Sequence, residues 1–330
     1  MTSRLIVACV LAALVCAGPL AAFERNSGKY GAMFYWWYTE LPAGVQAPPQ
    51  FPWDARDAAW WSAVVREARD GGLGYLAADA WGADTTADPA LLAPLVAAID
   101  RSAPGLKVAL FDDTTSEVLR KNQARGHGWT LDVRFDLSDL AGTGEGGLRY
   151  FYDEQWKRFF QTVPPQYRLT IDGRPVVFMW HGGFEWYTRQ DSFHTMIDAL
   201  RQATRRDFNV DPFVIVEESW SRLDPALRVE GLFDWFDPGR SFATLMPWNG
   251  FRVGQVVPGY DCRVCIPPVP VVARQDGRLY QAGLEAVAPG SDLVLIDGID
   301  NLDENAQLLT SPVWGRLYLA ITKWFAANVP

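Results

Sequence analysis

Acidic residues directly follow several short apolar runs in this 330-residue chain. Asp79 stands at the end of one run, Asp112 follows the next, and Glu217 and Asp297 follow two later ones. Cleavage of a glycosidic bond needs two carboxyl groups, because one protonates the leaving oxygen while the other stabilises or attacks the oxocarbenium-like centre. This repeated placement of carboxylates therefore indicates chemistry on carbohydrate.

The densest group of acids is the segment Asp297–Glu304, which also contains Asp300, Asn301 and Asp303. We take Asp297, Asp300 and Glu304 as candidate catalytic groups and Asn301 as a candidate substrate ligand. Alternating oxygen ligands also suit calcium, but the segment lacks the regular spacing of an EF-hand loop. Catalysis is therefore the preferred interpretation, and no metal site is predicted.

Glu217 and Glu218 are neighbours, so only one of them can point to a given face of a strand. The residues leave open which one faces the site, and Glu217 is carried as a catalytic candidate. Asp112 is a candidate for binding substrate hydroxyls, with pairing to an arginine as the equal alternative. Three further aspartates are predicted to cap helix N-termini, where this residue is favoured: Asp113, Asp224 and Asp237.

Histidine is scarce, with only His127, His181 and His194 in the chain. His181 lies at the end of an apolar run and precedes Gly182 and Gly183, which allow a ligand to approach closely. We take it as a substrate-binding candidate, the alternative being a hydrogen-bonded histidine of the core. So few histidines disfavour a metal-dependent enzyme, and no cofactor is predicted.

Fifteen tryptophans make the chain unusually rich in flat aromatic side chains. Large barrels bury some tryptophans, but the run Tyr35–Tyr38 places aromatic rings on both faces of one strand. Such rings stack on the C–H faces of sugars, and indole and phenol groups also offer polar edges. Besides His181 and Asn301, the candidate substrate-binding residues are Tyr35, Trp37, Asp79, Trp81, Asp112 and Trp180.

Cys262 and Cys265 are the two cysteines outside the N-terminal segment, and they form a lone CxxC pair. A zinc site needs two further ligands, and the histidines that might supply them are few. A redox-active pair is disfavoured because no helix start follows the two residues. We therefore predict a local disulfide, which fits an oxidising compartment.

Residues 1–22 follow the plan of a secretory signal peptide. Arg4 precedes an apolar stretch from Leu5 to Ala17, and small residues up to Ala22 offer a cleavage site before Phe23. The alternative of an uncleaved anchor is disfavoured because the stretch is short for a bilayer. We expect a secreted or periplasmic protein whose mature part is not stably inserted in a membrane.

The formal net charge of −9 excludes nucleic acid as the main partner, because phosphate binding needs a basic surface. The expected partner is a poly- or oligosaccharide. No linker, low-complexity stretch or short repeat divides residues 23–330, so a single domain is expected. The sequence carries no signal for a particular oligomeric state.

Short apolar runs alternate with helical patterns along the chain, as in parallel βαβ units. Eight runs are predicted to be strands: 31–38, 73–80, 106–111, 175–180, 213–216, 232–235, 252–257 and 293–296. Seven helices are predicted: 54–70, 89–101, 150–161, 192–205, 224–229, 278–288 and 313–327. This alternation predicts an α/β protein with a (β/α)8 TIM barrel, in which working residues lie at the C-terminal ends of the strands.

The chain resembles glycoside hydrolase family 99 and its relatives, the endo-α-mannosidase-like barrels. Segment 31–38 (GAMFYWWY) is similar to the family's opening strand, and segment 53–82 to its next helix and aromatic-rimmed strand. Segment 172–178 (DGRPVVF) is similar to the turn into strand four, and Trp314-Gly315 with Tyr318-Leu319 to the closing helix. These scattered matches extend over most of residues 30–325 and imply the family's barrel and a glycosidase activity.

The family carries an Asn-Glu-Trp-x-Glu-Gly motif after strand eight, and its position falls on residues 300–305. The resemblance implies that Glu304 is the general acid/base, because it falls on the second glutamate of the motif. The first glutamate, which assists through the sugar 2-hydroxyl, is replaced by Asn301. The second carboxylate is then expected from one of three residues: Asp300, Asp297 and Glu217.

The leading hypothesis is an exported glycoside hydrolase that cleaves a poly- or oligosaccharide by carboxylate acid/base catalysis. The missing motif glutamate motivates a second hypothesis, a non-catalytic carbohydrate-binding barrel. A third is a metal-dependent enzyme that modifies polysaccharides, built on strand-end aspartates and histidines. Release of reducing ends separates the first hypothesis from the second, and chelation tests the third.

Overall fold

Runs of β-branched, aromatic and small apolar residues form the parallel strands of a barrel. The computed structural model describes residues 23–38, 40–42, 44–126, 134–142, 147–180, 186–235, 241–262, 265 and 269–330. Eight strands of this described part make up the barrel: β1 (Tyr30–Phe34), β2 (Tyr75–Ala80), β3 (Lys107–Asp112), β6 (Arg174–Met179), β8 (Phe213–Glu217), β9 (Gly231–Phe233), β11 (Phe251–Val256) and β12 (Leu293–Ile296). Each of the eight predicted strand runs overlaps one of them.

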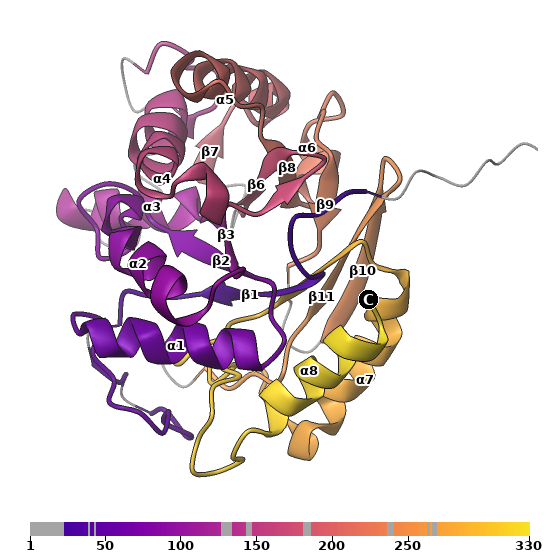
Figure 1. Cartoon of the computed structure of the whole chain (residues 1–330). Coiled ribbons are helices and arrows are strands. Elements are labelled where there is room, and N and C mark those ends of the chain that lie inside the picture. The colour runs from indigo at the N-terminus through magenta and orange to yellow at the C-terminus, as the bar shows by residue number, and fades with distance from the viewer. Residues whose placement is uncertain are drawn as a thin grey trace, which may run out of the picture.

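The strands are hydrogen-bonded in chain order from β1 to β9, and β12 pairs with both β1 and β11. All these pairs are parallel, and β9 lies against β11, so the sheet curves round almost to closure. Most connections between strands pass through helices on the outside, as Figure 1 shows, whereas between β9 and β11 the described chain forms a further strand, Ala243–Trp248. The predicted (β/α)8 architecture is confirmed.

Alternation along each strand separates two apolar cores. Residues such as Met33, Tyr75 and Phe178 fill the interior of the barrel, whereas Phe34 and Leu76 face the surrounding helices. This parity decides which strand-end side chains reach the mouth of the barrel. Beyond the C-terminal end of a strand, the first residue that continues the inward-facing alternation points toward a ligand in the mouth of the barrel.

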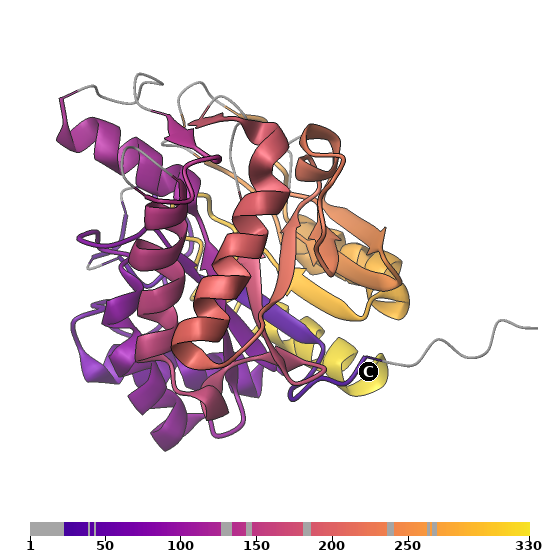
Figure 2. The ribbon, with the colours of Figure 1, turned by 90° about the horizontal axis from the view of Figure 1, so that it is seen from above.

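Helices surround the strands (Figure 2). Their buried residues are mainly apolar and recur with helical spacing. The described α-helices are α1 (Ala58–Asp70), α2 (Ala93–Ser102), α3 (Thr114–Ala124), α4 (Lys157–Thr162), α5 (Phe193–Phe208), α6 (Trp220–Leu223), α7 (Arg278–Val287) and α8 (Leu317–Asn328). A 3-10 turn (Pro89–Leu92) precedes α2, and a π-helical segment (Arg149–Trp156) precedes α4. None of the helices in these ranges is long and apolar enough to cross a bilayer.

The structure corrects three of the predicted helix features. A helix at 224–229 is wrong, because α6 ends at Leu223 and Asp224 instead accepts a hydrogen bond from His194 Nδ1 at 2.8 Å. The predicted helix 54–70 begins later than expected, at Ala58, because Asp57 caps α1 by accepting from the backbone N–H of Ala59. Helix α3 has no predicted counterpart, because buried polar residues interrupt its apolar face.

Four strands of the described residues lie outside the eight. Three have two residues each, β4 (Phe135–Asp136), β5 (Thr170–Ile171) and β7 (Tyr187–Thr188), and the fourth is β10 (Ala243–Trp248). Strand β10 pairs antiparallel with β11 through a two-residue turn at Asn249 and Gly250, both with positive φ. An Asn-Gly pair is the strongest short-range signal for such a hairpin. The sequence therefore contained a marker for β10 that the prediction did not use.

Candidate functional site

An open pocket occupies the C-terminal end of the barrel, with a water-accessible volume of about 200 Å³. It is lined by residues that end or directly follow β1, β2, β3, β6, β9 and β12, as expected for a (β/α)8 barrel. The lining residues are Met33, Tyr35, Trp37, Tyr38, Asp79, Trp81, Phe111, Asp113, Ser116, Trp180, Trp235, Asn301, Asp303 and Glu304. Seven of the predicted site residues are among them: Tyr35, Trp37, Asp79, Trp81, Trp180, Asn301 and Glu304.

Glu304 is held on one wall of the pocket by two hydrogen-bond donors. The Asn301 side-chain amide donates to Glu304 Oε2 at 2.7 Å, and the Tyr260 hydroxyl donates to Oε1 at 3.0 Å. The same Asn301 amide lies 3.4 Å from Asp297 Oδ1, which also accepts from the Tyr35 hydroxyl at 3.2 Å. Asn301 thus bridges two carboxyl groups that were predicted as separate catalytic candidates.

Burial raises the pKa of both bridged acids. It raises the pKa of Asp297 to about 7, with the charge of Glu304 as the second cause. It also raises the pKa of Glu304, although the hydrogen bonds from Asn301 and Tyr260 oppose the effect by favouring the ionised form. Both carboxyl groups therefore hold a proton to higher pH than an exposed carboxyl group does.

Asp79 faces the pocket from the end of β2. Burial and then the charge of Asp113 raise its pKa well above the usual range, and the charge of Asp297 adds to the shift. Its Oδ1 has no hydrogen-bond partner among the described residues. Asp113 caps α3 through the Ser116 backbone N–H, as predicted, and also lines the pocket. Burial raises the pKa of Asp113 to about 7.

Aromatic rings form the rest of the pocket wall. The centroids of Trp37 and Trp81 are 4.0 Å apart, and those of Trp180 and Trp235 are 5.1 Å apart. Tyr35 meets Trp37 edge to face with centroids 5.0 Å apart. These partly buried indoles leave flat faces beside the carboxyl groups, an arrangement suited to the apolar faces of sugar rings.

Four predicted site residues are not among the pocket-lining residues: Asp112, Glu217, Asp297 and Asp300. Asp297 contacts the lining residues Tyr35 and Asn301, as described above. Asp112 faces the helices rather than the barrel axis, where it accepts from Trp156 Nε1 at 2.7 Å and from the Thr114 hydroxyl. The role assigned to it in binding substrate is therefore replaced by a structural one, and burial raises its pKa to about 7. Asp300 is fully buried and accepts from the Tyr35 backbone N–H at 2.9 Å.

Glu217 ends β8 on an inward position, since Phe213 and Ile215 of that strand belong to the interior core. Its carboxylate accepts from the backbone N–H of Ser219 at 3.1 Å, and it does not line the pocket. Glu218, the alternative, pairs with Arg222. The candidate His181 lies outside the described residues, as does Asp237.

Several lining or supporting residues were not singled out as site residues. Tyr38 donates its hydroxyl to Asp303 Oδ2 at 3.2 Å, which orients that acid at the pocket edge. Trp235 is the last residue of the predicted strand 232–235, and in the structure it follows β9. Its place at the mouth of the barrel could therefore be predicted from the sequence. Tyr260 comes from the long connection after β11, and nothing in its sequence context marks it as a partner of Glu304.

Cys262 and Cys265 form the predicted local disulfide. Because both sulfurs are in this bond, the pair is not available as thiolate ligands for zinc. Potential metal ligands in the described pocket are carboxylates, and His194 lies elsewhere, beside Asp224.

We expect Asp297→Asn to change the pH dependence of stability. Because the folded-state pKa of Asp297 is above its unfolded value, the wild type loses stability as pH rises from about 4 through about 7. Asparagine cannot ionise, so the variant lacks this loss. The difference in free energy of unfolding, variant minus wild type, should therefore rise by at least ~1 kcal/mol from pH 4 to pH 8. Urea unfolding at both pH values measures this change, and parallel pH curves for the two proteins would contradict it.

Among the solved structures that share this fold are two of a glycoside hydrolase and one of a glycoside hydrolase-like protein. Two structures of the GH99 endo-alpha-mannosidase from Bacteroides thetaiotaomicron, one in complex with bis-tris propane, give TM-scores of 0.63 and 0.62. Both are 13% identical to this chain and cover 91% of it and 97% of their own chains. A structure described as a glycoside hydrolase-like protein gives 0.57 at 13% identity, covering 94% of this chain and 97% of that one.

At this identity the likeness establishes the fold, and it confirms the resemblance to the family 99 barrels that the sequence suggested. No curated protein matches the chain. A family model described as "Domain of unknown function (DUF5010)" matches residues 22–328, nearly the whole chain. The protein therefore belongs to the DUF5010 family and shares its fold with the family 99 glycoside hydrolases.

Proposed function

We propose that this protein is a glycoside hydrolase that cleaves a poly- or oligosaccharide, with Glu304 as the residue that transfers the proton. The observation that carries the proposal is the environment of Glu304: a carboxyl group with raised pKa in an aromatic pocket at the C-terminal end of a barrel. A general acid needs its pKa near the working pH, and burial has that effect on a carboxyl group.

In this proposal the substrate lies between two acidic walls. Glu304 protonates the leaving oxygen, and the Asn301 amide, which donates to both Glu304 and Asp297, holds the two carboxyl groups near each other. Asp79, which also lies near Tyr35, is a further carboxyl group of the pocket and in its ionised form stabilises the positive charge that develops on the sugar ring. Water then enters through the open side of the pocket, its oxygen bonds to the anomeric carbon, and the Glu304 carboxylate takes its proton, which restores the acid.

The lining also supports an uncharged sugar at the reacting position. Four carboxylic acids line the pocket, and none of its described lining residues is a lysine or arginine. A uronate or phosphorylated sugar would meet repulsion there without a compensating cation. The solved structures with this fold include an endo-alpha-mannosidase, which adds to the case for a neutral glycan.

A panel of neutral and acidic polysaccharides, assayed for new reducing ends, tests the proposal. We expect release from at least one neutral glycan, and none from polyuronates. The chelator EDTA should leave the rate unchanged, because the proposed mechanism uses carboxyl groups alone. A rate that disappears on chelation and returns with a divalent cation would contradict the proposal.

A second candidate function is carbohydrate binding without cleavage. It is favoured by one observation, the asparagine at position 301 where the family 99 motif has a glutamate. In that case a glycan of the panel binds saturably, for instance in titration calorimetry, and no reducing ends appear after long incubation. The aromatic walls serve both functions equally.

Trp81→Ala is expected to weaken glycan binding by about tenfold, because the variant loses one of two neighbouring ring faces. Trp81→Phe, which keeps a ring at this position, should recover most of the affinity. Trp324→Ala is the matched control, since Trp324 is 59% exposed on α8 and does not line the pocket. Equal dissociation constants for wild type and Trp81→Ala would exclude this wall from the sugar site.

We also propose that the protein is exported to the periplasm or secreted. The signal-like composition of residues 1–22 and the disulfide after β11 both support this proposal, because disulfides persist in oxidising compartments. N-terminal sequencing of the protein from its native host should begin at or near Phe23. Recovery of the cytoplasmic protein with Met1 intact would overturn the proposal.

A further inference from the structure

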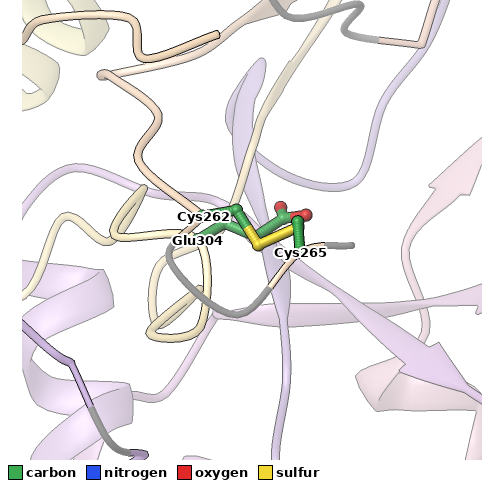
Figure 3. A group of neighbouring side chains, drawn as sticks. All are labelled: Cys262, Cys265 and Glu304. Atoms are coloured by element: carbon green, nitrogen blue, oxygen red, sulfur yellow. A yellow bond between two sulfur atoms is a disulfide. The ribbon is translucent and has the colours of Figure 1, made fainter. Parts of the chain in front are cut away.

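The Cys262–Cys265 disulfide lies directly against the carboxyl group of Glu304. A Glu304 carboxylate oxygen and the two sulfur atoms all lie within 4.8 Å of one another. Figure 3 shows the Glu304 carboxyl group beside the disulfide. The Tyr260 hydroxyl, 3.0 Å from Glu304 Oε1, is 3.8 Å from the sulfur of Cys265. The disulfide and Tyr260 therefore form one wall around the proposed acid/base.

Backbone contacts tie the same segment to the acidic loop after β12. The Asp261 N–H donates to the Glu304 carbonyl oxygen at 2.8 Å, and the Asn305 side-chain amide donates to the Asp261 carbonyl oxygen at 2.9 Å. Tyr260 and Val272 exchange two backbone hydrogen bonds of 2.9 and 2.8 Å, which fix the base of the segment. Glu304 is thus held through both its side chain and its main chain.

The position of the disulfide indicates a local role. Only two residues separate the cysteines, so the bond constrains little of the unfolded chain and contributes little to global stability by that route. Cys262 packs with Val257 and Tyr260 in a small apolar cluster, separate from the two barrel cores. The disulfide therefore acts on its immediate surroundings, which include the Glu304 side chain.

We propose that Tyr260 and the Cys262–Cys265 disulfide are positioning residues for Glu304, and that reduction of the disulfide disables proton transfer while the barrel stays folded. The proposal rests on the function proposed above. A dithiol reductant supplies two electrons and two protons, so the S–S bond breaks, two thiols form, and the reductant becomes a cyclic disulfide. Loss of the disulfide and loss of the Tyr260 hydroxyl would each act on Glu304 and leave the aromatic residues of the pocket wall in place.

The groups facing Glu304 set the direction of each effect. The loop after β12, which carries Glu304 itself, also supplies Asp297 and Asp303. Tyr35 directly follows β1, and Tyr260 lies in the connection after β11. Tyr260→Phe removes a donor to the carboxylate, so the pKa of Glu304 should rise. Loss of the disulfide loosens the wall and admits water, so the pKa should fall toward its ordinary value.

Two variants and one control separate these effects. Tyr260→Phe keeps the ring against the disulfide and removes only the hydroxyl, and the double change Cys262→Ser with Cys265→Ser mimics the reduced state. Tyr280→Phe is the matched control, because Tyr280 is a buried tyrosine of α7 whose hydroxyl bonds Thr322 Oγ1 at 2.8 Å, away from the pocket. Circular dichroism should show a folded barrel for all of them.

The activity readout is the split between kcat and KM on the glycan that the wild type cleaves. We expect kcat to fall about tenfold for Tyr260→Phe and further for the double serine variant, with KM changed less than about twofold. Dithiothreitol should lower kcat of the wild type and leave the double serine variant unaffected. A wild-type kcat that does not respond to reduction would overturn the proposal.

The second readout needs no substrate. In protein labelled with ¹³C at the glutamate carboxyl carbons, the signal that disappears in Glu304→Gln reports the titration of Glu304. We expect a higher midpoint in Tyr260→Phe, a lower one in the double serine variant, and no change in Tyr280→Phe. Unchanged midpoints in both site variants would overturn the positioning of Glu304, whereas shifted midpoints in a protein that cleaves no glycan would overturn only the proposed hydrolase.

Discussion

Glu304→Gln should lower kcat for glycan hydrolysis by about 10³-fold and leave the binding constant nearly unchanged. Glutamine has the same shape and can still accept from the Asn301 amide or from the Tyr260 hydroxyl, so the pocket should keep its form. It cannot donate an acidic proton to the leaving oxygen, and removal of a general acid costs 10²–10⁴-fold. Initial rates of reducing-end release and calorimetric titration measure the two effects separately.

The matched control for this change is Glu218→Gln. Glu218 stands at the same end of the barrel, after β8, but its carboxylate pairs with Arg222 and does not line the pocket. Its substitution should change kcat by less than about twofold, since an exposed ion pair contributes little. Full activity of Glu304→Gln would assign proton transfer to another acid.

Gly31→Ala should destabilise the barrel by about 3 kcal/mol, because the added methyl group would overlap the ring of Tyr75. Tyr75 has no room to move: it is fully buried, its ring stacks with Phe178, and its hydroxyl donates to the Val294 carbonyl oxygen at 2.7 Å. Strand β1 must therefore shift, and it carries Tyr35 to the pocket. Urea unfolding followed by tryptophan fluorescence gives the loss of stability.

Gly28→Ala provides the comparison for this strand. A methyl group at Gly28 would meet its nearest atom, the Cα of Gly74, at 3.7 Å, which is an ordinary contact. The free energy of unfolding should change by less than about 0.5 kcal/mol. If the two alanine variants were equally stable, the tight approach of β1 and Tyr75 in the barrel interior would be wrong.

The barrel itself was predictable because its strands carry a strong local signal. The eight runs are short and mainly apolar, although Asp234 interrupts one of them and Arg252 and Gln255 another, and all eight overlap a barrel strand. The C-terminal strand ends could be located for the same reason. The sequence therefore predicts site positions for Tyr35, Asp79 and Trp180, and the structure places all three in the pocket lining.

Parity within a strand explains where the prediction of the site was wrong. Asp112 stands one residue beyond the inward-facing Phe111, so it must face the helices, where Trp156 satisfies it. An apolar run shows where a strand ends, but it does not show which of its alternate positions faces the axis when both faces are buried. Glu217 faces inward and still does not reach the pocket lining, since Ser219 holds its carboxylate.

The loop after β12 lies beyond strand periodicity altogether. Asp297, Asn301 and Glu304 converge through contacts of the Asn301 amide, while Asp300 turns to the backbone of Tyr35. The order of these residues does not reveal that division. Tyr260 was unpredictable for another reason, because it reaches Glu304 from a connection far away in sequence.

The most direct test of the proposed hydrolase is product analysis in ¹⁸O-labelled water. Wild-type protein is incubated with the neutral glycans of the panel, and the products are analysed by mass spectrometry beside Glu304→Gln. The proposal predicts shorter chains that carry one ¹⁸O atom at each new reducing end with the wild type, and intact glycan with Glu304→Gln. Intact glycans throughout, from a wild-type protein that binds them saturably, would contradict hydrolysis and leave a carbohydrate-binding barrel.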